Sequence, residues 1–327
     1  MLLQIILLGL SFALLAWSAD RFVLGASATA ALLGLSPLLV GLTIVAFGTS
    51  APELLVSALA ALAGSPGLAV GNAIGSNIAN MGLILGLTAL FAPLLIRGRI
   101  LQREVPAMAL VMLGTWLLML NGRLDRPEGI ALLAGLVALT AWLAWIIRRS
   151  NGNGADAALV APVNGLPEDA PTRLPRALLW LLLGLVVLLI SAQTAVWAAT
   201  GLAERAGVAE TVVGLTLVAV GTSLPELATC LAAARRSQGD IAIGNIIGSN
   251  IFNLLGVLGL AATLRPVALE PGILSRDYAT MAGITLIFFL LSHGLRQRGH
   301  VGRAAGAFLV LLWVAWLVWL GLDNLGP

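Results

Sequence analysis

Residues 41–87 begin with GLTIVAFGTSAPELLVS and end with GLAVGNAIGSNIANMGLILGL, and residues 214–260 begin with GLTLVAVGTSLPELATC and end with DIAIGNIIGSNIFNLLGVLGL. The two copies align without a gap at an offset of 173 residues, and about 25 of the 47 aligned positions are identical. Each copy places one glutamate, Glu53 or Glu226, in an otherwise apolar segment. A carboxylate at bilayer depth costs roughly 2.5–3.5 kcal/mol on insertion scales. A matched pair of such carboxylates predicts a functional site.

The composition is that of a membrane protein with several spans. Of 327 residues, 59% are apolar and 10% are charged, with a mean hydropathy of +1.01, whereas a soluble domain carries about 25% charged residues. The sequence holds no basic cluster with interleaved aromatic residues, which argues against nucleic-acid binding. It also holds no G-x-S-x-G, H-E-x-x-H or P-loop motif, so we expect neither an enzyme nor a resident cofactor.

Apolar runs of about the length of a bilayer span predict ten helices. They fall at 2–33, 36–63, 68–95, 104–120, 127–147, 175–200, 208–234, 240–263, 274–293 and 301–321. We expect the first run to be a helix of the fold, because it lacks the basic start and the clear cleavage site of a signal peptide. Residues 149–174, rich in Gly, Pro, Asn and Asp, predict a flexible linker between two membrane regions, 1–148 and 175–327.

The spacing of the two copies predicts their orientation. Five spans separate them, so the second copy must insert upside down relative to the first. The predicted fold class is therefore an all-α integral membrane protein of ten transmembrane helices in two inverted five-helix repeats, an architecture typical of secondary transporters. Twelve arginines fall in the odd-numbered connections and five in the even-numbered ones. The positive-inside rule then predicts a cytoplasmic linker and both termini outside.

The first motif of each copy brings carboxylate and hydroxyl groups onto one face of a helix. Thr49 and Ser50 precede Glu53 by four and three residues, so the three share a face. Pro52 has no N–H, which leaves the carbonyl of Gly48 without its helical partner. The second copy repeats this arrangement with Thr222, Ser223, Pro225 and Glu226. The motif therefore predicts a broken helix with oxygen atoms gathered at the break.

The second motif adds amides and a hydroxyl. Asn72, Ser76 and Asn80 are four residues apart, and Gly71 and Gly75 form a small-xxx-small pair that allows close helix contact. The second copy has Asn245, Ser249, Asn253, Gly244 and Gly248. Oxygen donors without thiolate or imidazole suit hard cations such as Ca²⁺. Packing is the alternative role for such residues, and we favour it for Asn72, Asn77, Asn245 and Asn250.

With the GTSxPE and GNxxGSN motifs each present twice, the whole chain resembles the calcium/cation antiporter superfamily, specifically the prokaryotic sodium/calcium exchangers. The resemblance implies that helix pairs two/three and seven/eight build the cation sites. It implies side-chain ligands at Thr49, Ser50, Glu53, Ser76, Asn80, Thr222, Ser223, Glu226, Ser249 and Asn253, with backbone oxygens from Ala46 and Ala219. Some relatives have Asp where Asn80 or Asn253 stands here, which argues against potassium coupling and leaves the number of bound Na⁺ ions open.

The sequence and the resemblance together predict a secondary active antiporter of the bacterial plasma (inner) membrane. We expect it to exchange Na⁺ for Ca²⁺ by alternating access and to extrude Ca²⁺ electrogenically, with these two ions and the lipid bilayer as its only evident partners. A Ca²⁺/H⁺ antiporter on the same fold is the main alternative, because buried glutamates can also take protons. A passive cation channel and a membrane protein without transport activity are more distant alternatives.

Overall fold

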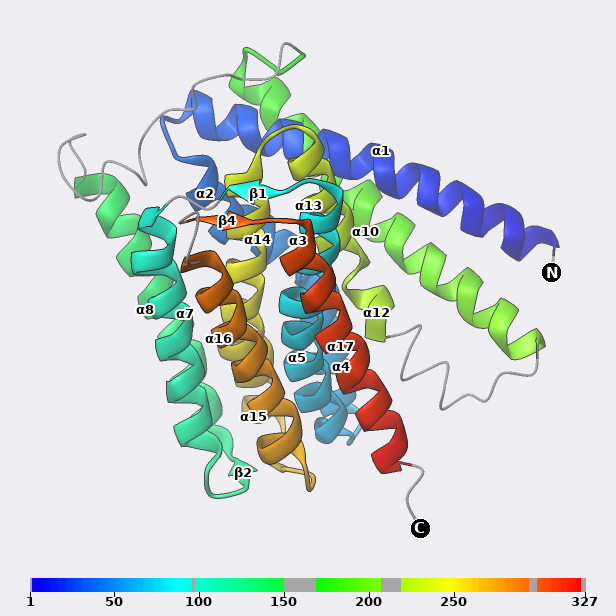
Figure 1. The fold of residues 1–327 in the computed structure, drawn as a ribbon, viewed down its shortest axis with the longest axis vertical. Coiled ribbons are helices and arrows are strands. Elements are labelled where there is room, and N and C mark those ends of the chain that lie inside the picture. Colours follow the sequence, from blue (N-terminus) through cyan, green and yellow to red (C-terminus); the bar gives the residue numbers. More distant parts are fainter. Residues whose placement is uncertain (1, 96–97, 150–168, 207–218, 294–298, 325–327) are drawn as a thin grey trace. The chain divides into compact units, whose positions relative to one another are not determined.

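The computed structural model describes residues 2–95, 98–149, 169–206, 219–293 and 299–324, and nearly all of them are helical (Figure 1). The first half of the chain contains α1 (Leu2–Leu32), α2 (Pro37–Val40), the π-helical η1 (Gly41–Val45), α3 (Ala46–Thr49), α4 (Ala51–Leu62), α5 (Pro66–Ala79), the π-helical η2 (Asn80–Ile84), α6 (Leu85–Phe91), α7 (Gly98–Met119) and α8 (Arg126–Arg149). The second half contains α10 (Leu174–Arg205), α12 (Ala219–Thr222), α13 (Leu224–Arg235), α14 (Gly239–Phe252), η4 (Asn253–Val257), α15 (Leu258–Leu264), η5 (Ile273–Tyr278), α16 (Ala279–His293) and α17 (Arg303–Asn324). Antiparallel pairs join β1 (Leu94–Leu95) to β4 (His300–Val301) and β2 (Arg123–Leu124) to β3 (Val267–Ala268). The prediction of a mainly helical chain is confirmed.

Seven helical stretches in the described part of the chain are long and apolar enough to cross a membrane, and an eighth is added if the pair broken at Ser50 counts as one span. The expected run at 104–120 corresponds to a shorter apolar helix, Glu104–Met119. The expected run at 208–234 begins outside the described residues. Most of the expected linker at 149–174 also lies outside them. The chain is therefore a membrane protein, and the count of ten spans stays a prediction.

The chain forms two compact units, and each unit takes segments from both copies of the repeat. Unit 1 consists of Met1–Glu53 and Val137–Ser249, and unit 2 consists of Leu54–Leu136 and Asn250–Pro327. The boundaries fall directly after Glu53 in the first copy and directly after Ser249 in the second. As a result, both intramembrane glutamates belong to unit 1.

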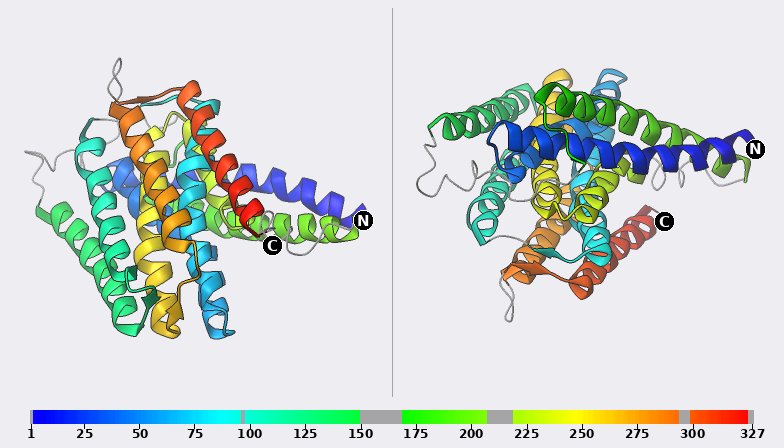
Figure 2. Two further views of the ribbon diagram at one scale, coloured as in Figure 1. Left: turned by 60° about the horizontal axis from the view of Figure 1, so that its bottom comes forward. Right: turned by 90° about the horizontal axis from the view of Figure 1, so that it is seen from above.

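In unit 1, α1 lies side by side with α10, and α14 packs closely on the segment that contains η1 (Figures 1 and 2). A Cβ atom added to Gly244 would lie 2.6 Å from the carbonyl oxygen of Leu38, and one added to Gly41 would lie 2.7 Å from that of Ile241. No side chain fits at these distances, so glycine is what allows the two backbones to meet. The close contact expected at Gly244 and Gly248 is therefore confirmed.

In unit 2, α17 packs on α6 through a second pair of glycines. A Cβ atom added to Gly306 would lie 2.7 Å from the carbonyl oxygen of Gly86. The pair expected from the sequence, Gly71 and Gly75, makes no such contact in unit 2. A Cβ on Gly71 would meet no described atom within 4 Å, and one on Gly75 would meet only the ring of Trp316, at 3.9 Å. A bulky indole occupies the place where we expected a helix backbone.

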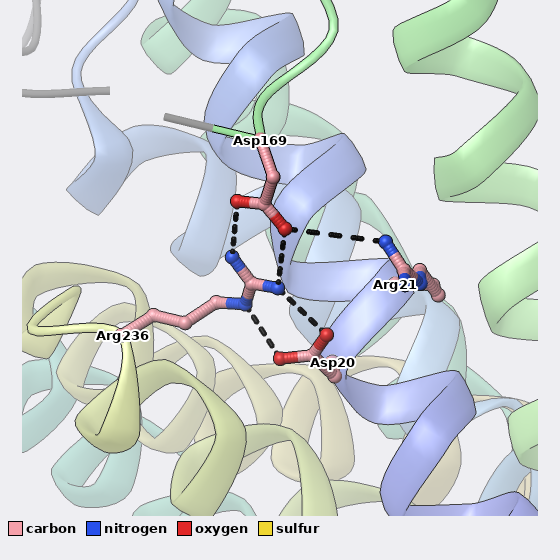
Figure 3. Close-up of polar contacts among 4 residues, drawn as sticks. All are labelled: Asp20, Arg21, Asp169 and Arg236. Atoms are coloured by element: carbon pink, nitrogen blue, oxygen red, sulfur yellow. Dashed lines mark hydrogen bonds and ion pairs between the residues drawn. The ribbon is translucent and has the colours of Figure 1, made fainter. Parts of the chain in front are cut away.

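A charged cluster of unit 1, defined by Asp20, Arg21, Asp169 and Arg236, holds three distant segments together (Figure 3). The Arg236 guanidinium donates two hydrogen bonds of 2.6 Å to the Asp20 carboxylate and bonds of 3.1 and 3.2 Å to Asp169. The Arg236 hydrogen bonds hold the pKa of the Asp169 carboxyl below its usual range. Arg21 lies 4.0 Å from Asp169 and stacks 5.1 Å from the ring centre of Trp180. The cluster fixes the end of the interhelical linker to α1 and to the turn after α13.

Candidate cation site

The sequence breaks a helix at the same point in both copies. Ser50 has φ −83° and ψ 7° at the end of α3, and Ser223 has φ −88° and ψ 6° before α13. In each copy a proline, Pro52 or Pro225, follows within the first turn of the next helix, where a missing N–H is tolerated. The predicted break is therefore confirmed in both copies, and each glutamate lies in the first turn after it.

Unit 1 brings the two glutamates together. The side chains of Glu53 and Glu226 are buried, with 0% and 1% of their surface exposed. The Ser50 hydroxyl donates a hydrogen bond of 3.1 Å to the Glu226 carboxylate, and Ser223 lies beside Glu53. The two carboxylates are close enough to repel each other electrostatically. Each copy thus contributes the serine that faces the glutamate of the other copy.

Threonine and asparagine residues surround the carboxylates of unit 1. The Thr49 hydroxyl lies 3.0 Å from the side-chain oxygen of Asn245 and 3.4 Å from the backbone oxygen of Ala46. The amide of Asn245 in turn donates to the sulfur of Cys230 at 3.5 Å. In unit 2 the equivalent Asn72 donates to Ser57 at 2.9 Å. Both asparagines hold neighbouring helices together, which agrees with the packing role that we favoured for them.

Unit 2 contains the amide-bearing part of the predicted set. Ser76, Asn80 and Asn253 are buried, with 4%, 1% and 1% of their surface exposed. Asn80 and Asn253 occupy equivalent positions, and each begins a π-helical segment, η2 or η4. Their backbone oxygens accept from the N–H groups of Leu85 and Leu258, five residues later. Such π-bulges occur frequently at functional sites, and the sequence pattern did not reveal them.

Several buried oxygen atoms have no hydrogen-bond partner among the described residues. In unit 1 these include Oε2 of Glu226 and Oγ of Ser249, and in unit 2 they include the side-chain oxygens of Asn80 and Asn253. An unsatisfied buried polar group costs about 1–3 kcal/mol, so each one requires an explanation. Within each unit, a coordinated cation is one kind of partner that could satisfy such oxygen atoms.

The twelve predicted site residues divide between the two units. Unit 1 holds Ala46, Thr49, Ser50, Glu53, Ala219, Thr222, Ser223, Glu226 and Ser249. Unit 2 holds Ser76, Asn80 and Asn253. The described part of the chain contains no group of three or more His, Cys, Asp or Glu side chains that could hold a metal ion. Within unit 1, the two carboxylates and the neutral oxygens around them make up a ligand set that suits hard ions.

Comparisons with known proteins agree with one another. The chain matches the family described as "Sodium/calcium exchanger protein" over residues 3–145 and 176–322. It is 41% identical to "Inner membrane protein YrbG" of Escherichia coli (strain K12), with 98% of each chain covered. It is 33% identical to "Sodium/calcium exchanger MaX1" of Methanosarcina acetivorans, with 96% of this chain and 97% of the relative covered. A solved structure of the sodium-calcium exchanger NCX_Mj matches with a TM-score of 0.81 and 30% identity, over 97% of this chain and 98% of that chain.

Proposed function

Because the chain belongs to the sodium/calcium exchanger family, we propose that it is a secondary active antiporter that exchanges Na⁺ for Ca²⁺ across the membrane by alternating access. The observation that carries the proposal is the buried pair Glu53 and Glu226, set among hydroxyl groups from both copies of the repeat. Relatives named as a sodium/calcium exchanger and a putative antiporter support the choice of ions and the transport class.

The buried pair gives a physical reason for exchange rather than simple leak. Two ionised carboxylates contribute a charge of −2 to a site from which water is largely excluded. Closing the protein around that uncompensated charge is costly, because desolvation of buried charge is expensive. One Ca²⁺ or two Na⁺ would bring the net charge of the site to zero, and a third Na⁺ would bring it to +1. The carrier therefore changes sides with Ca²⁺ or with Na⁺ bound, and transport of one ion requires return of the other.

The proposed ligands are the twelve site residues, with Glu53 and Glu226 shared between the two ions. Ser50 and Ser223 would each contribute a hydroxyl oxygen beside a carboxylate of the other copy, as their positions suggest. The hydroxyl oxygens can coordinate Na⁺ without carrying a proton, which favours sodium over protons as the coupling ion. With three Na⁺ per Ca²⁺, one net charge moves per cycle, and moving it through 100 mV is worth about 2.3 kcal/mol. An inside-negative potential would then drive Ca²⁺ out.

We further propose ten transmembrane helices in two inverted five-helix repeats, with the 149–174 linker cytoplasmic and both termini outside. The repeat offset, the equivalent breaks at Ser50 and Ser223, and the equivalent π-helical segments η2 and η4 support the repeat. Twelve arginines in the odd-numbered connections against five in the even-numbered ones support the orientation. The relative named as an inner membrane protein supports a location in the plasma membrane of a bacterium.

The test is uptake of ⁴⁵Ca²⁺ by proteoliposomes that contain the purified protein. We expect an outward Na⁺ gradient to drive uptake, and an inside-positive potential, set with potassium and valinomycin, to accelerate it. Uptake that ignores voltage would indicate two Na⁺ per Ca²⁺. Uptake driven by a pH gradient instead of Na⁺ would establish the Ca²⁺/H⁺ antiporter, and flux that ignores every opposing gradient would establish a channel.

A further inference from the structure

A chain of amide contacts in unit 2 leads from a backbone carbonyl to one of the proposed ligands. The side-chain nitrogen of Asn77, in α5, donates a hydrogen bond of 3.1 Å to the backbone oxygen of Asn250, in α14. The side-chain nitrogen of Asn253 donates a hydrogen bond of 3.1 Å to the side-chain oxygen of Asn77. All three residues are buried, with 1%, 2% and 1% of their surface exposed.

This chain fixes the direction in which each amide points. A backbone carbonyl can only accept a hydrogen bond, so the NH₂ group of Asn77 must face Asn250. The side-chain oxygen of Asn77 must then face Asn253, and it accepts a hydrogen bond from the NH₂ group of Asn253. An asparagine side chain has one NH₂ end and one oxygen end, so the oxygen of Asn253 is left pointing the other way. That oxygen is buried and has no hydrogen-bond partner among the described residues.

We propose that Asn77 is a positioning residue, which makes Asn253 offer its carbonyl oxygen, rather than its NH₂ group, to the transported cation. The proposal rests on the proposed function, because it needs Asn253 to be a ligand. An amide presented with its NH₂ end would repel a cation, since that end carries positive partial charge. Asn77 does not touch the ion in this scheme and acts only through Asn253.

The second copy of the motif shows that this arrangement is not a general property of the sequence. Asn250 is the equivalent of Asn77, at the offset of 173 residues. Both polar atoms of the Asn250 side chain are buried without a hydrogen-bond partner among the described residues. The equivalent ligand, Asn80, is therefore not held by Asn250 in the way that Asn253 is held by Asn77. Among the described residues, the asparagine of the first copy, Asn77, therefore orients a ligand of the second copy, whereas Asn250 does not orient the ligand of the first copy.

The experiment is a double-mutant cycle on Ca²⁺ binding to the purified full-length protein, with Asn77→Leu and Asn253→Asp. Leucine has nearly the shape of asparagine and removes both hydrogen bonds. We expect Asn77→Leu to raise the half-saturating Ca²⁺ concentration about tenfold, since loss of a neutral hydrogen bond has an effect of that order. Aspartate at 253 has an oxygen at both ends, so it needs no orienting partner. In the Asn253→Asp background, we expect Asn77→Leu to change the half-saturating concentration by less than about twofold.

The controls separate this proposal from a purely structural role and from the proposed function. Thr88→Val removes another buried hydrogen bond of unit 2, from the Thr88 hydroxyl to the backbone oxygen of Ile84 at 2.6 Å, and should leave Ca²⁺ binding unchanged. If Asn77→Leu does not fold, Asn77→Ser serves, because its shorter side chain cannot reach both partners. Equal losses in both backgrounds, or no loss in a protein that exchanges Na⁺ for Ca²⁺, would overturn the positioning role. Failure of the wild-type protein to exchange the ions would instead count against the proposed function.

Discussion

Unit 1 holds two pairs of carboxylates in very different surroundings. Asp20 and Asp169 share one guanidinium, that of Arg236, through four hydrogen bonds between 2.6 and 3.2 Å. Glu226 accepts a hydrogen bond from the Ser50 hydroxyl, and a second carboxylate, Glu53, lies close enough to interact with it electrostatically. Among the described residues, Glu226 forms no ion pair with an arginine.

The difference indicates what each pair is for. Where the protein supplies the positive charge, the carboxylates are satisfied within the fold and hold segments together. Where hydroxyl groups such as that of Ser50 face the carboxylates, we propose that an external cation supplies the positive charge. Two carboxylates of unit 2, Asp277 and Asp323, follow the first pattern, because both pair with Arg276. Asp277 also accepts a hydrogen bond from Trp316. The predictions below test this distinction, from the largest expected effect to the smallest.

The largest effect is expected at the glutamates. Glu53→Gln and Glu226→Gln keep the size and polarity of the side chain but remove one charge, which leaves a bound Ca²⁺ with a net +1 in a buried site. We expect each variant to abolish Na⁺-driven ⁴⁵Ca²⁺ uptake while inserting normally. Glu128→Gln, a glutamate in the first turn of α8, should transport at the wild-type rate. Uptake at that rate in either site variant would refute the shared site.

Removal of the charge at the centre of the paired cluster should affect stability rather than transport selectivity. Arg236→Gln leaves Asp20 and Asp169 without their guanidinium, and hydrogen bonds to charged groups contribute roughly 1.5–3 kcal/mol each when well shielded. Because the cluster is partly exposed, we expect a loss of about 1–2 kcal/mol in the free energy of unfolding.

The measurement for Arg236→Gln is the melting temperature of the purified protein, alongside its half-saturating Ca²⁺ concentration. The melting temperature should fall and the Ca²⁺ concentration should stay constant. The double variant Asp20→Asn with Arg236→Gln removes the charge of Asp20 together with that of Arg236. Its melting temperature should lie between those of the wild-type protein and Arg236→Gln. A change in Ca²⁺ affinity without loss of stability would mean that the cluster belongs to the transport site after all.

A smaller effect is expected from the hydroxyl that faces Glu226. Ser50→Ala removes a hydrogen bond and a proposed Na⁺ ligand, and a net loss of about 1 kcal/mol corresponds to roughly a fivefold rise in the half-saturating Na⁺ concentration. Ser191→Ala is the matched control, because the buried Ser191 hydroxyl donates to the backbone oxygen of Val187 in its own helix, at 2.6 Å, and makes no other hydrogen bond to the described residues. Sodium-dependence curves for the two variants should differ by that factor. Identical curves would remove Ser50 from the site.

The smallest effect concerns the pH dependence of the paired cluster. The hydrogen bonds from Arg236 lower the pKa of Asp169 below its ordinary value of 3.8. A lowered pKa means that the stabilisation is fully present above that ordinary value and is lost as the pH falls through the lower pKa of the folded protein. The wild-type protein should therefore melt slightly above Asp169→Asn at pH 5 and higher, and the gap should begin to narrow below about pH 4. A gap that does not narrow as the pH falls below about 4 would show that the Asp169 charge is not its source.

The amino-acid sequence by itself determined the local features of this protein. Hydrophobic runs predict the helices, because a membrane helix must be apolar over its length. Pro52 and Pro225 predict the breaks, because proline cannot continue the backbone hydrogen bonds. The repeat identifies the two glutamates, and helical spacing places Thr49 and Ser50 on the same face as Glu53. The family resemblance that these motifs carry was confirmed over 3–145 and 176–322.

Only the tertiary structure decided which of these groups meet. Ser50 contacts Glu226, 176 residues away, and Asp20 contacts Arg236, 216 residues away. Helical periodicity fixes which residues share a face, but it carries no information about which face of another helix lies opposite. For that reason the sequence did not show which side chains would face Asp20 and which would face Glu53. The fold gives one an arginine and the other a second carboxylate, and that difference separates a structural ion pair from a candidate cation site.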